Sequence, residues 1–283
     1  GDWSNASSEV EFQGALAQMI GEEGRGVATI LEMVALTRQD CMIGSSGVMR
    51  QALVQAIHHA RHRKAFGKLL IDQPLMRNVL ADLALESEAS MALTLRVARA
   101  VDRSPHDPAE AAFARIATAI GKYWICKRCP PFVNEAQECL GGAGYVEESI
   151  LPRLYRQAPL NAIWEGSGNI QCLDVLRALA KEPATRDALL AEYSSVKGVS
   201  ALLDQAVAAL TKSIGEVEQL EVRSRGIVEQ MAVCLQAAVL IQAGNGVVAD
   251  AFCHGRLGGG TGRMFGAGVV EHAMALVEST FLE

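Results

Sequence analysis

Apolar residues recur every three or four positions along most of the chain, the spacing that places them on one face of a helix. The pattern predicts a long helix from just after Gly26 to about His59, and a second helix that begins at Pro74 and ends near residue 102. Further helices are expected at about 108–127, 131–140, after Glu165, at about 196–221 and 225–253, and at the C-terminus. The chain is therefore predicted to be almost entirely helical.

Two stretches interrupt this helical pattern. At the start, SEVEFQGA (residues 8–15) alternates acidic and apolar residues, which predicts a β-strand. In KEPATRD (residues 181–187), Pro183 cannot continue a helix and the composition becomes more polar, which indicates a boundary. We therefore expect two helical bundles in series, preceded by a short strand.

The composition limits the class of protein. With 283 residues, 50% of them hydrophobic, the chain is long enough to bury one large core or two moderate ones. Its net charge of −6 gives no overall attraction to nucleic acid or to acidic membranes. The pattern predicts no membrane-spanning run and no signal peptide, so we expect no membrane partner and a cytoplasmic location.

The cysteines are odd in number and lie mostly in apolar helical stretches, which indicates reduced thiols acting as small core residues. Cys126 and Cys129 form a C-x-x-C pair. A second pair at zinc spacing and a βαβ context are both missing from the sequence pattern. Packing is therefore favoured over redox or metal chemistry, and no metal site is expected.

Two short stretches carry groups suited to binding phosphate. RKAFGKLLIDQP (residues 63–74) places Arg63 and Lys64 next to an aromatic ring and a glycine, and an arginine pairs well with a diphosphate. LGGAGY (residues 140–145) presents bare backbone amides. The first stretch fits a helix end followed by a tight loop at least as well, and in the second a lone glycine pair favours the end of a helix, so neither alone indicates a phosphate site.

A third stretch, NAIWEGSGNI (residues 161–170), places a carboxylate among apolar residues at the start of a helix. It fits a turn, in which Ser167 caps the helix, Gly166 adopts an unusual backbone angle and Glu165 faces water. It also fits a general base, because a poorly hydrated Glu165 is suited to removing a proton from carbon. The local sequence leaves both interpretations open.

The three stretches occur in an order that resembles the C-terminal half of the acyl-CoA dehydrogenase flavoproteins. Longer stretches, such as QPLMRNVLADLAL and ICKRCPPFVNEAQECLGGAGYVEES, are similar to the AidB-like branch of that family, which bacteria make under alkylation stress. The resemblance runs from about Ser4 to Leu179. It weakens after Pro183, although that branch also carries an extra helical domain there.

The resemblance implies a domain plan. Family members have an N-terminal helical domain, a middle β-domain and a C-terminal four-helix bundle, with FAD held between the last two and across a subunit boundary in a tetramer. Residues 1–24 would then be a remnant of the middle β-domain, residues 25–182 the four-helix bundle and residues 183–283 the extra helical domain. We therefore expect an all-α fold with a remnant β-strand at the N-terminus, FAD as cofactor, and a homotetramer.

The resemblance also implies the site residues. Glu165 matches the family's catalytic base, which takes the α-proton of an acyl-CoA thioester as a β-hydride passes to FAD. The residues implied in FAD binding are Arg63 and Phe66 at the diphosphate and adenine side, Gln73 nearby, Gly141 and Gly142 at the phosphates from a neighbouring subunit, and Ser167 and Asn169 after the base. Many family members have threonine and glutamine in place of Ser167 and Asn169, and glutamine in place of Glu138.

DNA binding is the alternative hypothesis. The AidB-like branch is associated with DNA through a basic face of its last domain, in keeping with protection against alkylation and little dehydrogenase turnover. Residues 184–283 contain seven Lys and Arg against eleven Asp and Glu, so DNA binding requires Arg223, Arg225, Arg256 and Arg263 to gather on one face. On its own the chain is expected to fold but to be inactive as a dehydrogenase, because the resemblance assigns much of the flavin pocket to the β-domain.

Overall fold

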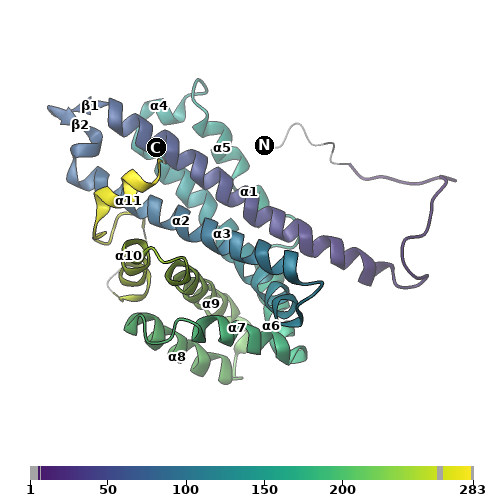
Figure 1. Cartoon of the computed structure of the whole chain (residues 1–283). Helices are drawn as coiled ribbons and strands as arrows, with labels where there is room; N and C mark the ends of the chain where they lie inside the picture. Colours follow the sequence, from purple (N-terminus) through teal and green to yellow (C-terminus); the bar gives the residue numbers. More distant parts are fainter. Residues whose placement is uncertain (1–5, 7, 260–263, 282–283) are drawn as a thin grey trace.

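The computed structural model describes residues 6, 8–259 and 264–281, and the regular secondary structure within them is helical apart from one short hairpin (Figure 1). The helices are α1 Gly26–His62, α2 Pro74–Arg103, α3 Pro108–Leu140, α4 Gly142–Tyr145, α5 Leu151–Gln157, α6 Gly168–Lys181, α7 Pro183–Ser194, α8 Ala201–Gly215, α9 Leu220–Gln242, α10 Gly246–Leu257 and α11 Ala273–Ser279. Two 3-10 helices, η1 Leu70–Asp72 and η2 Leu160–Ala162, and the strands β1 Lys64–Ala65 and β2 Lys68–Leu69 complete the described elements. The all-α fold is confirmed.

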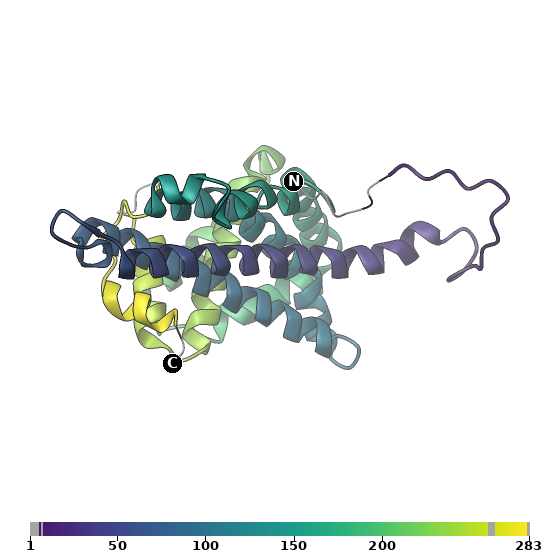
Figure 2. The ribbon, with the colours of Figure 1, turned by 90° about the horizontal axis from the view of Figure 1, so that it is seen from above.

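The three long helices α1, α2 and α3 pack side by side at the centre of the molecule (Figures 1 and 2). Their facing sides bury apolar residues at helical spacing, among them Met42 and Leu53 of α1, Leu83 of α2 and Ile120 of α3. Burying a side chain of this size contributes roughly 1.5 to 3 kcal/mol. The antiparallel β1–β2 hairpin joins α1 to α2 at one end of this bundle.

α3 continues through two consecutive prolines, so the break expected between residues 127 and 131 is wrong. Pro130 and Pro131 lack backbone N–H groups and normally end or kink a helix. Here the flanking side chains Cys129, Phe132 and Val133 are buried against the rest of the core. Tertiary packing therefore holds the helix where local preference alone would end it.

The segment after α6 packs onto the same bundle, with α7 against α3 and α9 against α2, α3 and α6. Buried residues on both sides of Pro183 belong to one hydrophobic cluster, for example Val175 and Ala178 before it and Leu189 and Met231 after it. The division into residues 25–182 and 183–283 stays a prediction, since the two segments share their core.

The single helix expected at residues 225–253 is two helices, α9 and α10. The chain turns between them at Gly244, whose φ of 80° suits glycine. Asn245 then caps α10, because its side chain accepts a hydrogen bond from the backbone N–H of Val248 (3.4 Å). The helix expected at residues 196–221 is shorter than predicted and is α8.

Residues 8–25 contain neither helix nor strand, so the β-strand expected at residues 8–15 is not formed. A strand needs a neighbour to complete its backbone hydrogen bonds, and the described residues place none beside this segment. Its apolar side chains Val10, Phe12 and Leu16 are exposed. Their assignment to a β-domain stays a prediction.

Among the described helices, α9 alone is long and apolar enough to cross a membrane by length and composition, contrary to the pattern-based expectation of none. However, 72% of its most apolar window is buried inside the protein. A buried core helix passes the same test, so α9 is weak evidence for a membrane segment.

Candidate active site

Glu165 lies in the short loop between η2 and α6, in an uncommon backbone conformation. Its φ is 56° and that of Gly166 is 89°, so two successive residues are left-handed. For a residue other than glycine this conformation persists only where the surrounding structure holds it, as happens at many functional sites. The Glu165 side chain is half-buried, while the neighbouring Trp164 is 40% exposed.

Lys122 of α3 holds this loop from the protein interior. The residue is 1% exposed. Its Nζ donates hydrogen bonds to the carbonyl oxygens of Trp164 (2.6 Å) and Gly166 (2.5 Å). Burial lowers the pKa of Lys122, because the ammonium group has left water. One buried amine thus contacts the carbonyls on both sides of Glu165.

The carbonyl oxygen of Glu165 has two further donors. Arg38 of α1 donates through Nε (3.2 Å), and Gln171 of α6 donates through Nε2 (3.1 Å). Gln171 also reaches the carbonyl of Gly166 (2.9 Å). Arg38 is itself fixed by an ion pair with Asp174 (2.8 Å). Donors from three helices therefore converge on the backbone of this loop.

The side chain of Trp164, the residue before Glu165, is fixed by a separate set of bonds. Its indole Nε1 donates to Oδ1 of Asn161 (2.9 Å). Asn161 in turn donates through Nδ2 to Ser45 Oγ (3.2 Å) and to the carbonyl of Cys41 (3.3 Å), both on α1. The ring of the residue that precedes Glu165 is thus held in a defined place.

The Glu165 carboxylate takes no part in these contacts. Among the described residues it forms no hydrogen bond and no ion pair, since every bond of the residue runs through its backbone oxygen. A carboxylate left without a partner is available to accept a proton from a bound molecule. The role of Glu165 as a general base stays a prediction.

Several residues expected to bind FAD lie at the hairpin end of the bundle. Arg63 caps the C-terminus of α1 and is exposed, and Phe66 is 98% exposed at the tip of the hairpin with φ 52°. Gln73 occupies the N-cap position of α2 and donates through Nε2 to the carbonyl of Ala65 (3.1 Å), which ties the hairpin to the helix. This end therefore presents a cation and an aromatic ring to the surroundings.

Gly141 and Gly142 join α3 to α4, which Figure 1 places at the hairpin end of the molecule. Both are exposed, and a Cβ added to either would meet no atom within 4 Å. The turn is stabilised by Gln137, whose Nε2 donates to the carbonyl of Gly144 (3.1 Å). Glu138, where many family members have glutamine, instead accepts a bond from Asn134 (2.9 Å).

The structure does not bring the hairpin and Glu165 together. Arg38, which contacts Glu165, and Arg63 are separated along α1 by about 37 Å at roughly 1.5 Å per residue. Ser167 and Asn169 lie near Glu165 and are exposed. Ser167 occupies the N-cap position of α6, but its side chain makes no capping hydrogen bond, so the capping role expected for it is wrong.

The sequence pattern alone does not identify the residues that hold Glu165. Lys122 offers a signal, because it is a lone charge inside the apolar run AIGKYWIC. Asp174 is likewise a lone charge in IQCLDVL. Buried charges without partners are costly, so such positions predict an internal network, although not its target.

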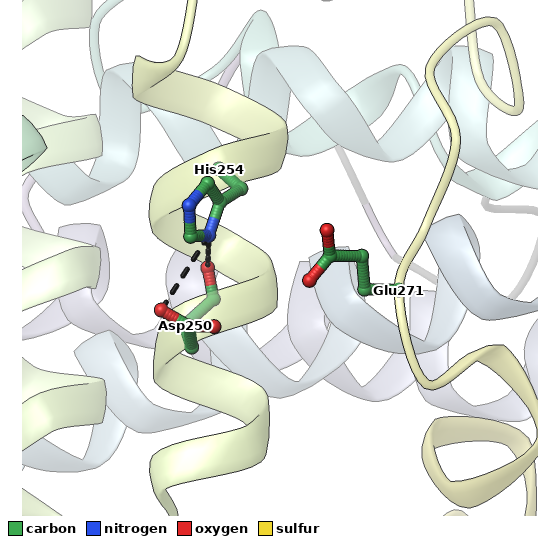
Figure 3. Close-up of side chains that lie close together, drawn as sticks. All are labelled: Asp250, His254 and Glu271. Atoms are coloured by element: carbon green, nitrogen blue, oxygen red, sulfur yellow. Dashed lines mark hydrogen bonds and ion pairs between the residues drawn. The ribbon is translucent and has the colours of Figure 1, made fainter.

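The C-x-x-C pair is buried as expected, and all seven cysteines are buried free thiols. Burial raises the pKa of the Cys126 thiol to about 12. A second group, Asp250, His254 and Glu271, has the residue types of a metal site (Figure 3). All three are exposed, and His254 Nδ1 already lies 3.1 Å from the carbonyl of Asp250, so we assign no metal to this surface group.

The arginines needed for a DNA-binding face have other partners where they are described. Arg256 pairs with Asp82 (2.6 Å) and Glu86 (3.0 Å) and is only 16% exposed, so it does not belong to a basic face. Arg223 pairs with Glu216 (3.4 Å). Arg225 is exposed, and Arg263 lies outside the described residues. DNA binding stays a prediction.

Comparison with known proteins adds a family context. Residues 24–180 match the family model for the acyl-CoA dehydrogenase C-terminal domain. The chain is 48% identical over 254 residues to the putative acyl-CoA dehydrogenase AidB of Escherichia coli, an alignment covering 89% of this chain and 46% of that protein. Its fold is similar to that of Bd2924 in its apo form, with a TM-score of 0.76, 31% identity, and coverage of 82% of this chain and 46% of the other.

A second structural relative is Caenorhabditis elegans ACDH-11 in complex with C11-CoA. The TM-score is 0.73 at 27% identity, and the match covers 93% of this chain and 49% of that one. The chain thus spans about half the length of these relatives, or less.

Proposed function

The chain belongs to the acyl-CoA dehydrogenase family, and from this membership we propose that it supplies the catalytic base of an FAD-dependent acyl-CoA dehydrogenase, with Glu165 removing the α-proton of an acyl-CoA thioester. The observation that carries the proposal is the backbone of Glu165. It is held left-handed by buried donors, while its carboxylate remains without a partner among the described residues.

Proton removal from carbon requires a base that is aimed and poorly hydrated. The loop orients the base, because Lys122, Arg38 and Gln171 fix the backbone of Glu165 and of the residues on either side of it. The ring of Trp164, the preceding residue, is 40% exposed and offers an apolar surface to a bound molecule. An acyl chain seated against this surface would exclude water from Glu165 and strengthen its effective basicity toward the substrate.

The exposed groups at the hairpin end fit FAD. Arg63 offers a guanidinium for a diphosphate, and Phe66 offers an exposed ring for the adenine side. At Gly141 and Gly142 no side chain obstructs the approach of a phosphate to the backbone. When bound, FAD supplies the acceptor for the β-hydride of the substrate. Ser167 and Asn169 would contact it near the base.

The distance along α1 supports a shared cofactor site. Arg63 lies about 37 Å from the level of Glu165, so we expect the hairpin of one subunit to serve the FAD of another. A homotetramer is the assembly expected for this arrangement. The C11-CoA bound to the ACDH-11 relative supports an acyl-CoA as substrate.

The test is Glu165→Gln in the full-length, FAD-loaded protein. The substitution keeps the size of the side chain and removes the proton acceptor, so flavin bleaching by a panel of acyl-CoAs should slow by a factor of about 100 or more. The FAD content should be unchanged. Glu148→Gln, at an exposed glutamate, is the control and should bleach at the parental rate. Bleaching of Glu165→Gln at that same rate contradicts the assignment.

A further inference from the structure

Three successive carbonyl groups, those of Trp164, Glu165 and Gly166, all face buried donors. Lys122 Nζ bonds the first and the third, at 2.6 and 2.5 Å. Arg38 and Gln171 bond the middle one, at 3.2 and 3.1 Å. Carbonyls that follow one another in a regular strand or helix do not converge on one amine in this way. The left-handed conformation of Glu165 and Gly166 is what lets the two outer oxygens meet Lys122.

We propose that Lys122 is a positioning residue that holds Glu165 in its left-handed conformation and so directs the carboxylate toward the acyl substrate. The catalytic part of this inference rests on the proposed function of Glu165. Lys122 does not face the substrate, because its amine is directed at the backbone from the interior side of the loop. Its effect on the reaction therefore passes through Glu165.

The burial of Lys122 requires a reason that packing does not supply. A methionine would fill the same volume without the cost of taking an ammonium group out of water. Among the described residues Lys122 forms no ion pair, and its hydrogen bonds go to the carbonyls of Trp164 and Gly166 alone. A buried amine with this pair of contacts is suited to fix a strained turn, which needs strong donors at fixed points.

The neighbouring donors do not replace Lys122. Arg38 divides its guanidinium between the Glu165 carbonyl and Asp174. Gln171 reaches Glu165 and Gly166 but not Trp164, and its Oε1 has no hydrogen-bond partner among the described residues. Lys122 is thus the donor that ties the residues before and after Glu165 to each other.

The first test measures the loop in this chain without cofactor. Hydrogen exchange of the amides of Ile163 and Trp164, which bond the carbonyl of Leu160, reports on loop opening. Lys122→Met should exchange these amides about tenfold faster or more, as expected for losing hydrogen bonds from a charged donor. Lys181→Met is the control, an exposed lysine at the end of α6 remote from the loop, and should leave the loop unchanged.

A second substitution separates strain from general loosening. Glycine adopts left-handed angles freely, so in a Glu165→Gly background the loop should need Lys122 less, and Lys122→Met should accelerate exchange by clearly less than tenfold. An equal acceleration in both backgrounds, or none in either, overturns the proposal. If Lys122→Met does not fold, the uncharged and shorter Lys122→Gln is used, and unchanged exchange in that variant also overturns it.

The catalytic test is a double-mutant cycle in the full-length, FAD-loaded protein. Lys122→Met should slow flavin bleaching at saturating acyl-CoA by about 10- to 100-fold, since small displacements of a reacting group have effects of this size, and leave the concentration for half-saturation nearly unchanged. In a Glu165→Gln background, Lys122→Met should slow bleaching further by less than about threefold, because the carboxylate that Lys122 positions is no longer present.

The outcomes separate the two proposals. If Glu165→Gln bleaches at the parental rate, the proposed function fails, while the exchange experiment still decides whether Lys122 holds the loop. If Glu165→Gln is slow but Lys122→Met bleaches at the parental rate, the positioning role fails alone. If Lys122→Met has the same effect in both backgrounds, it acts independently of Glu165, which also overturns the proposal.

Discussion

Glu192 of α7 forms a two-bond ion pair with Arg96 of α2, with each carboxylate oxygen 2.9 Å from a guanidinium nitrogen. Arg96 also pairs with Glu110 of α3 (2.8 Å) and lies 4.1 Å from the centre of the Phe113 ring. The pair joins the segment after Pro183 to the helices that precede it, at a point where the Arg96 side chain is only 12% exposed. The two segments are thus connected by charge as well as by the shared core.

Arg96→Met is therefore expected to destabilise the whole chain. The change leaves Glu110 and Glu192 without their cation at a largely buried position, which costs about 3 kcal/mol in the free energy of unfolding. Urea denaturation followed by circular dichroism measures the loss, and we expect one transition, because α7 and α2 share a core. Arg99→Met, three residues on and exposed, is the control. A loss below about 1 kcal/mol would show that the pair is not structural.

Arg63→Ala should weaken FAD binding in the full-length protein. A guanidinium on a diphosphate makes charge-assisted hydrogen bonds worth roughly 1.5 to 3 kcal/mol, so the dissociation constant should rise about tenfold or more. Titration of the apoprotein with FAD, followed by quenching of flavin fluorescence, gives the constant. Arg103→Ala, at the opposite end of α2, is the control. An unchanged constant for Arg63→Ala would reduce Arg63 to a helix-end charge.

Much of the helical framework follows from local sequence. The apolar repeat and the prolines at the starts of α2 and α3 mark these helices, and Asp107 caps α3 by accepting from the amides of Ala109 and Glu110. What local preference misses is decided by packing. Pro130 and Pro131 signal a break, yet the buried residues around them keep α3 continuous.

The candidate site likewise has a part that local sequence predicts and a part that only the fold brings together. Glu165 was predictable because the motif around it lies within a few residues of sequence. Its support was not, because Lys122 and Arg38 are 43 and 127 residues distant and meet the loop only in the fold. A lone lysine in an apolar run predicts a buried hydrogen-bond acceptor. The acceptors here are backbone carbonyl oxygens, which every residue has, so the sequence does not indicate which ones they are.

Cys126 and Cys129 should be unreactive in the native protein. Burial raises the pKa of Cys126 to about 12 and that of Cys129 further, so at pH 8 roughly one Cys126 thiol in ten thousand is the reactive thiolate. Titration with Ellman's reagent should therefore show slow reaction of both thiols at pH 8 and rapid reaction of all seven cysteines in guanidinium chloride. Rapid native reaction that is lost in a Cys126→Ser, Cys129→Ser variant would instead support redox chemistry.

Glu86 of α2 should make stability depend on pH in the acid range. The residue is 1% exposed and pairs with Arg128 (3.0 Å) and Arg256 (3.0 Å). Burial alone would raise the pKa of this carboxyl, but the two guanidinium groups outweigh burial and lower it below the ordinary value of 4.5. Because the unfolded chain binds the proton more readily, the ion pairs contribute fully above pH 4.5, and the contribution is lost as the pH falls through the folded pKa.

Glu86→Gln tests this dependence. At pH 7 the variant should be about 3 kcal/mol less stable, because Arg128 and Arg256 lose their shared buried partner. The difference from the parent should shrink as the pH falls below 4.5, where the parental carboxyl begins to bind a proton. Urea denaturation between pH 3 and pH 7 measures both effects, with Glu88→Gln as control, since Glu88 forms no ion pair among the described residues. A difference that stays constant across this range would mean that Glu86 contributes through packing and hydrogen bonding rather than through its charge.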